Sequence, residues 1–120
     1  MRTAKVLRGG GEVLIARCGV TETAGERLRG LLPRASLGSD EGLWFPRISS
    51  VHTFFMRFAI DVAFVDRRGR VIALYHSLRP WRHTWIHPFA TCGGTLEASA
   101  GLFARVGLGQ GEELRICPTS

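Results

Sequence analysis

The chain has 120 residues, of which 45% are hydrophobic and 22% charged, as is typical of one globular domain, which we expect to span residues 1–120. Charged residues and glycines interrupt every hydrophobic run before it reaches the about 20 residues of a membrane-spanning helix, so we expect no transmembrane segment. The formal net charge is +6, and Lys5 is the only lysine, so the positive charge is almost all arginine. Such a charge attracts phosphate groups or anionic membranes, but it does not select a function class by itself.

The N-terminus and the cysteines favour an intracellular protein. No apolar stretch of signal-peptide length precedes the glycines at residues 9–11. Cys18, Cys92 and Cys117 are an odd number of cysteines without a CxxC pair, which is typical of reduced thiols and not of a disulfide framework. We therefore expect a cytoplasmic location.

The first part of the chain predicts a hairpin and then a short helix. Residues 6–7 and 12–18 have the pattern of two strands joined by the glycine turn at 9–11. Residues 21–33 predict a helix near the N-terminus, because Thr23 and Glu26 have capping-box spacing and Pro33 prevents continuation. The residues from 34 to 42 are rich in Ser, Gly and Asp and predict a loop.

Strands dominate the middle of the chain. Residues 51–58 alternate with apolar side chains on both sides, which predicts a central strand with two buried faces. Residues 60–65 and 70–75 predict a hairpin, in which Gly69 supplies the left-handed position of a short turn.

The last third alternates loops and short elements. Residues 78–88 combine aromatic residues with prolines and predict a structured loop, followed by a strand at 94–98, a helical turn at 100–106 and a closing strand at 113–117. Short connections between many strands predict a mainly β, compact, antiparallel domain. The sandwich, jelly-roll-like and barrel-like forms all remain open, and a parallel βαβ sheet would need more helices.

Several sequence blocks together resemble a known family. They are Glu-Arg-Leu-Arg-Gly-Leu-Leu at 26–32, Gly-Leu-Trp-Phe at 42–45, the His-Thr-Phe-Phe-Met-Arg-Phe-Ala-Ile-Asp-Val-Ala-Phe-Val-Asp run at 52–66, and shorter matches at 69–71, 80 and 96–101. In this order the blocks are similar to the bacterial and archaeal family called domain of unknown function 192. The resemblance implies a compact β-sandwich or jelly-roll-like fold and no established activity.

Two blocks depart mildly from the family's pattern. The chain has Gly111-Glu112 where the family commonly has a Gly-Asp pair, and Leu43-Trp44-Phe45 where it commonly has methionine and phenylalanine. Both changes retain charge or hydrophobicity.

Metal, cofactor and nucleophile motifs are weak in this sequence. His83 and His87 have the i, i+4 spacing of ligands on a helix, but prolines bracket the segment and no glutamate follows His83, so we expect no metal. The glycines at 9–11 lack a following Lys-Ser or Lys-Thr, and we expect no bound cofactor. Neither a Gly-x-Ser-x-Gly elbow nor a sequence-adjacent base for Cys92 or Cys117 is present.

Two carboxylates interrupt apolar strands, and each admits two interpretations. Asp61 is either a general base or ligand acceptor, or a structural residue that accepts backbone N–H groups or pairs with Arg27 or Arg57. Glu97, between Leu96 and Ala98, has the same two interpretations. We favour the structural interpretation for both and assign no catalytic residue.

Aromatic residues interleaved with arginines form the strongest binding signal. Such a combination suits a sugar, single-stranded nucleic acid or an acidic peptide. Trp44 and Phe45 belong to it, but the loop that contains Trp81 and Trp85 is the preferred place. The ligand-binding candidates are Trp81, Trp85, Arg82, His83, Arg27 and Asp61.

Three functional hypotheses follow. The first is a non-catalytic accessory domain that binds a small ligand or a protein partner, and the second is an enzyme that uses Asp61 or Glu97 as acid or base. The third is nucleic-acid binding, which is less favoured and requires the arginines at 67, 68, 70, 79 and 82 to form a continuous stripe.

Overall fold

The computed structural model describes residues 1–23, 26, 36–85 and 91–119, and this part of the chain is mainly β. The predicted helix at 21–33 falls mostly on residues outside this description. Within it the chain forms the following elements: β1 (Arg2–Arg8), β2 (Val13–Val20), β3 (Glu41–Pro46), β4 (Ser50–His52), β5 (Ile60–Asp66), β6 (Val71–Leu78), β7 (His83–Trp85), β8 (Cys92–Ser99), the helix α2 (Leu102–Val106) and β9 (Leu114–Pro118).

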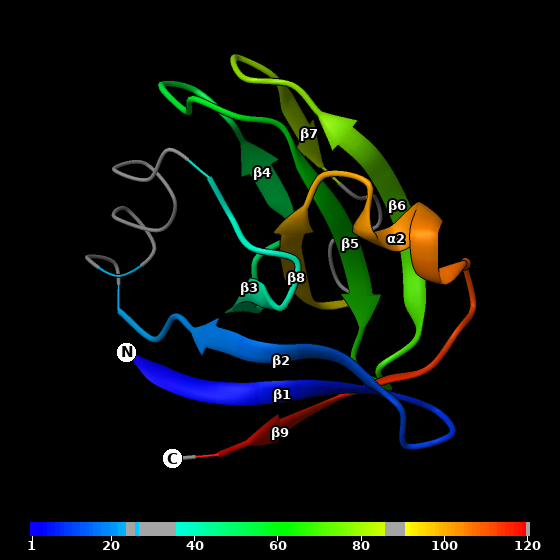
Figure 1. Ribbon diagram of the computed structural model, residues 1–120. Coiled ribbons are helices and arrows are strands. Elements are labelled where there is room, and N and C mark those ends of the chain that lie inside the picture. Colours follow the sequence, from blue (N-terminus) through cyan, green and yellow to red (C-terminus); the bar gives the residue numbers. More distant parts are fainter. Residues whose placement is uncertain (24–25, 27–35, 86–90, 120) are drawn as a thin grey trace.

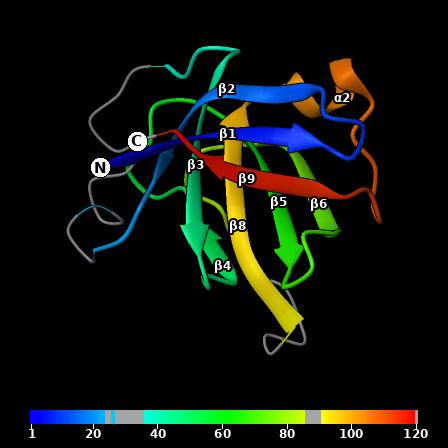
Figure 2. The ribbon, with the colours of Figure 1, turned by 90° about the horizontal axis from the view of Figure 1, so that it is seen from below.

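Seven strands form one curled sheet in the order β6-β5-β8-β3-β2-β1-β9, and β4 pairs with β7 in a separate two-stranded ribbon. Figure 1 shows the curl, with β1, β2 and β9 at the bottom and β5 and β6 rising above them. From below, β1, β2 and β9 run across the direction of β3, β8 and β5 (Figure 2). Of the alternatives left open by the sequence, this sheet corresponds to the barrel-like one, as a half-barrel.

One strand pair departs from the expected antiparallel arrangement. Strand β3 pairs with β2 in parallel, with Arg17 opposite Glu41 and Val20 opposite Trp44. A parallel pair needs a connection of about a dozen residues or more, which the segment between β2 and β3 provides. The expectation of a wholly antiparallel sheet was therefore wrong at this one pair.

The two edges of the curl meet at one end. The amide of Leu114 donates to the carbonyl of Gly69 at 2.7 Å, Gly111 donates to Val71 at 2.7 Å, and Val71 donates to Glu112 at 2.9 Å. We call these three hydrogen bonds the seam. They connect the β5–β6 turn with the residues that lead into β9, so the two edge strands of the half-barrel, β6 and β9, are joined at one end.

The predicted hairpins are confirmed. Strands β1 and β2 pair antiparallel, as do β5 and β6, with Gly69 at φ 89° in the β5–β6 turn. The strand predicted at 51–58 was wrong, because β4 ends at His52 and the amide of Met56 turns back to the carbonyl of Thr53. Phe54 and Phe55, expected inside a central strand, are exposed.

Side chains on the two faces of the sheet form two apolar clusters. The concave face carries Ala63, Leu96 and Ala98, against which α2 packs Leu102 and Phe103. On the other face, alternate residues of β3 and β5, together with Cys92 of β8, form a cluster that includes Val51 of β4. This second cluster anchors the ribbon to the sheet.

Within the described residues, no helix is long and apolar enough to cross a membrane.

Candidate functional site

The β4–β7 ribbon presents large apolar side chains to solvent. Phe54 is 39% exposed, Phe55 73%, Trp81 56% and Trp85 53%. The loops after β4 and before β7 lie next to each other at the top of Figure 1. We define the aromatic patch as these four residues together with two histidines that face each other across the ribbon, His52 and His83.

The rings of the aromatic patch contact one another. Phe55 and Trp81 lie with their ring centroids 4.7 Å apart, and Phe54 lies 6.1 Å from Trp81. His52 stacks on Phe54 at 5.2 Å, and His83 lies 5.2 Å from Trp85. Each ring of the aromatic patch therefore packs against at least one other ring of the patch.

Both ring-bearing turns contain unusual backbone. Phe55 and Trp81 each have φ 66°, in the left-handed region that bulky L-residues rarely adopt. Each such residue costs on the order of 1 to 3 kcal/mol and persists only where the surrounding structure imposes it. The fold thus accepts backbone strain at two exposed aromatic residues that contribute little to its core.

Thr53 imposes this geometry. Its side chain is fully buried, and its hydroxyl donates to the carbonyl of Arg79 at 2.6 Å and accepts from the amide of Arg82 at 2.9 Å. Its backbone carbonyl accepts from the amide of Trp81 at 2.9 Å, and its amide donates to the carbonyl of Arg82 at 2.8 Å. One threonine therefore ties together the two loops that carry the rings.

The surroundings of the aromatic patch are basic. Arg57, Arg79 and Arg82 are exposed next to it. The chain has no aspartate or glutamate at 42–60 or at 67–96, the segments that contain the ribbon. An acidic group approaching this surface meets no like charge from these segments.

Asp61 lies on the concave face of the sheet. It is fully buried, and its carboxylate accepts the amides of Ser77 at 2.8 Å, Gly101 at 3.1 Å and Phe103 at 2.9 Å. Ser77 lies where the pairing of β5 with β6 shifts register, and the other two amides begin α2. The carboxylate thus connects β5, β6 and α2. The backbone amides are the partners, Arg57 is exposed, and Arg27 lies outside the described residues.

Glu97 lies on the opposite face, in a cross-strand row between Leu43 and Val62. It is 8% exposed, and no hydrogen bond reaches it from the described residues. Desolvation raises the pKa of its carboxyl from the ordinary 4.5 to about 8, so the group is mostly protonated at neutral pH. Its two cross-strand neighbours, Leu43 and Val62, are apolar.

Two of the three cysteines, Cys18 and Cys92, are buried. All three are free, and burial raises the pKa of the Cys18 thiol to about 12 and also raises that of Cys92. Cys92 donates its thiol to the carbonyls of Ile48 and Gly94. In the part of the chain that is described, no three His, Cys, Asp or Glu side chains gather as metal ligands.

The arginines named for a nucleic-acid stripe fall into two groups. Arg67, Arg68 and Arg70 lie at the β5–β6 turn, whereas Arg79 and Arg82 follow the far end of β6. The eight residues of β6 separate the groups by roughly 25 Å at the usual rise of a strand. A continuous stripe is absent from these five positions.

The structure brings four of the six predicted binding residues together, namely Trp81, Arg82, His83 and Trp85. Asp61 faces the other side of the sheet. Sequence reasoning missed Phe54 and Phe55, which it assigned to a strand interior. No local signal marked them, because threonine is common in strands and the hydroxyl of Thr53 bonds to backbone groups 26 and 29 residues away.

Comparisons with solved structures support the fold, and a family model identifies the family. A crystal structure of a protein of unknown function from Novosphingobium aromaticivorans has a TM-score of 0.77 at 25% identity and covers 94% of this chain and 83% of its own. Another, from Sinorhizobium meliloti and named a "putative transcription regulator", has a TM-score of 0.77 at 18% identity and covers 96% and 92%. No curated protein matches the chain. The model of DUF192, described as "Uncharacterized ACR", matches residues 5–116, so the chain belongs to this family.

Proposed function

We propose that this protein is a non-catalytic binding domain that docks a partner protein through the aromatic patch. The partner contributes an acidic segment with apolar side chains. The observation that carries the proposal is the exposure of four aromatic side chains, two of them on strained backbone. Strain at exposed residues stabilises no core, so a role in recognition explains it best.

The chemistry of the aromatic patch favours a protein segment over the other occupants. Tryptophan and arginine are enriched among the residues that dominate protein interfaces. The ring planes of Phe55 and Trp81 are tilted by 58°, so these two rings do not form one flat stacking platform for a base. Since Thr53 already holds both loops, binding loses little conformational entropy. The three exposed arginines select an acidic sequence.

The other hypotheses have less support. Asp61 is saturated by backbone amides, and Glu97 has only apolar neighbours in its row, so neither is placed for acid–base chemistry. The regulator name of the Sinorhizobium meliloti protein belongs to that protein, and the division of the arginines across β6 weighs against a nucleic-acid surface. We propose action in the cytoplasm, because the cysteines are free thiols.

The test is selection of peptides from a random displayed library on the immobilised full chain, followed by fluorescence anisotropy with the enriched peptides. We expect acidic peptides with aromatic or aliphatic residues. The key variant is Phe55→Gly, because glycine adopts φ 66° without strain. It should retain the stability of the parent in urea unfolding and weaken peptide binding by about tenfold or more.

Val13→Ala is the matched control, since Val13 is an apolar residue, 47% exposed, in β2 and outside the ribbon. Its peptide affinity should equal that of the parent. Unchanged binding by Phe55→Gly would contradict the proposal. The proposal would also be contradicted if the chain selected no peptide and instead sedimented with phosphatidylglycerol vesicles. The same holds if it selected no peptide and bound an oligothymidylate through Trp81.

A further inference from the structure

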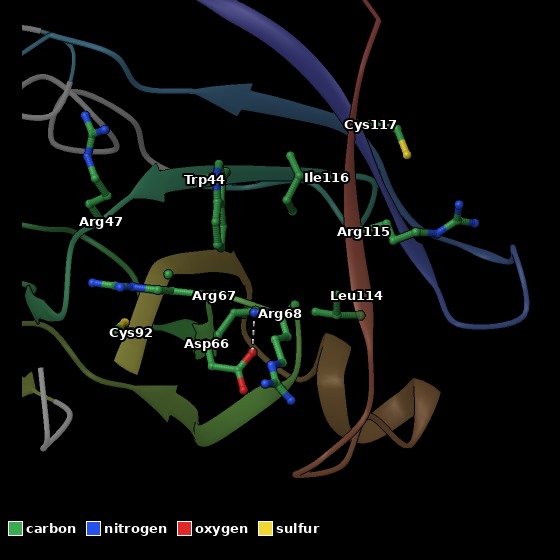
Figure 3. A pocket seen from close by; sticks show the side chains of 13 residues that line it. Trp44, Arg47, Asp66, Arg67, Arg68, Cys92, Leu114, Arg115, Ile116 and Cys117 are labelled. Carbon is green, nitrogen blue, oxygen red and sulfur yellow. Dashed lines mark hydrogen bonds between the residues drawn. The ribbon is translucent and has the colours of Figure 1, made fainter. Parts of the chain in front are cut away.

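A cavity opens at the mouth of the half-barrel, away from the aromatic patch. Its volume is about 820 Å³, within the range of small-molecule sites. Three places in the fold line it: the end of β3, the β5–β6 turn with the adjacent start of β8, and β9. Figure 3 shows these segments around the opening, with Trp44, Leu114 and Ile116 directed into it. We call this space the mouth cavity.

The apolar wall of the mouth cavity continues the concave core. Trp44, Val65, Leu114 and Ile116 line it, and all four belong to or pack against the same apolar cluster as α2. The indole of Trp44 lies over Gly94, where an added Cβ would overlap the six-membered ring. The glycine at 94 therefore makes room for the indole of Trp44. The indole also lines the mouth cavity, where it can contact a ligand.

The rim of the mouth cavity is basic. Arg47, Arg67 and Arg68 line it and are exposed, and within the described residues none of them forms an ion pair. Asp66 is the carboxylate of this rim, but its Oδ1 already accepts the amides of Arg68 at 2.8 Å and Arg70 at 2.9 Å. Its role is to fix the turn that carries the arginines. Positive charge at the rim thus exceeds negative charge.

The apolar wall and the basic rim select one kind of ligand. Guanidinium groups form their strongest hydrogen bonds with carboxylates, sulfonates and phosphates. Aromatic and aliphatic side chains bind an apolar body. We propose that the mouth cavity is a binding site for a small organic anion, with its body against Trp44, Leu114 and Ile116 and its charged group at Arg67 and Arg68. This site is independent of the aromatic patch, and either can fail without the other.

The probe is 1-anilinonaphthalene-8-sulfonate, an aromatic anion whose fluorescence reports binding, and its neutral analogue is N-phenyl-1-naphthylamine. The full chain with Trp81→Phe and Trp85→Phe retains Trp44 as its only tryptophan. We expect one sulfonate to bind per chain, with energy transfer from Trp44. Binding should raise the melting temperature, because a ligand of the native state stabilises it.

In the same chain, the double change Arg67→Gln and Arg68→Gln should weaken sulfonate binding about tenfold or more and change binding of the neutral analogue less than about twofold. Arg57→Gln with Arg79→Gln is the matched control, since it removes equal charge beside the aromatic patch. Octanoate and phenyl phosphate should compete with the probe. Ile116→Glu, which places a carboxylate in the mouth cavity, should abolish binding.

Three results would overturn this site. Equal weakening by both double variants would reduce the effect to net charge, and a fall in melting temperature with probe would indicate binding to unfolded chain. Competition by inorganic phosphate as strong as by phenyl phosphate would show an oxyanion site in which the apolar wall takes no part.

Discussion

Among single residues, Glu97 is a buried carboxyl that no hydrogen bond reaches from the described part of the chain. A carboxyl between Leu43 and Val62 is neutral when the chain folds near neutral pH, since its pKa rises to about 8 through desolvation. In the unfolded chain the same group ionises at its ordinary pKa of 4.5. The native state therefore binds this proton more tightly than the unfolded state, and stability must fall as the proton is lost.

We predict that Glu97→Gln removes this pH dependence. The contribution of Glu97 is fully present below pH about 4.5, declines by up to about 1.4 kcal/mol per pH unit towards pH about 8, and is constant above that. The free energy of unfolding of Glu97→Gln should thus rise relative to that of the parent by on the order of 4 kcal/mol between pH about 5 and pH about 8.5. Urea unfolding at both pH values measures it.

Glu12→Gln serves as the control, because Glu12 is an exposed glutamate just before β2. Its stability should follow that of the parent at both pH values. Parallel pH profiles of Glu97→Gln and the parent would show that Glu97 is ionised in the native state.

From the sequence, Asp61 and Glu97 were both predicted to be buried carboxylates, with the same structural and catalytic interpretations. The sequence could not predict that Asp61 accepts backbone amides whereas Glu97 has apolar cross-strand neighbours. Both interrupt apolar strands, and only the pairing of strands determines what faces each. Asp61 meets the amides of the β6 register shift and of α2, which lie 16 to 42 residues away in the chain. Such distant partners leave no local sequence signal.

At the level of elements, the loops of the ribbon depend on Thr53 for their shape. The side-chain hydroxyl satisfies backbone groups of both Arg79 and Arg82. A valine of similar size would fill the same space and remove the hydroxyl that partners the carbonyl of Arg79 and the amide of Arg82, which costs about 1 to 3 kcal/mol for each buried group.

We predict that Thr53→Val destabilises the chain by about 2 kcal/mol or more and loosens the aromatic patch. The near-ultraviolet circular dichroism of the aromatic rings should weaken, and acrylamide should quench the tryptophans more strongly. Thr84→Val is the control, because Thr84 is a buried threonine of β7 whose hydroxyl bonds to no described residue. If both variants behave alike, the hydroxyl of Thr53 does not position the rings.

Elements with local signals were predictable from the sequence, and those shaped by distant contacts were not. The β5–β6 hairpin was found because its two strands flank a turn with Gly69, all within one short segment. Strand β3 was missed, since its neighbours β2 and β8 lie far from it in the chain. The alternation at 51–58 suggested a strand, but the loop is held by Thr53 bonds to residues 79 and 82, outside any sequence window.

For the whole molecule, the closure of the half-barrel depends on the seam between the β5–β6 turn and β9. No strand pattern predicted these contacts, because they join residues far apart in sequence. The seam also supports the mouth cavity, since Gly69 and Leu114 line it. The glycine is required twice: its φ is 89°, and an added Cβ would overlap the carbonyl oxygen of Leu114.

We predict that Gly69→Ala destabilises the chain by about 2 kcal/mol or more and opens the seam before the rest of the sheet. Amide hydrogen exchange should accelerate at Leu114 and Gly111, whose amides donate across the seam, and much less at Val62 in the interior of the sheet. Gly10→Ala is the control, since Gly10 lies in the β1–β2 turn with no atom near an added Cβ. Equal acceleration of hydrogen exchange at all three amides would mean that the seam opens only when the whole chain unfolds. The mouth cavity would then be as stable against local opening as the core behind it.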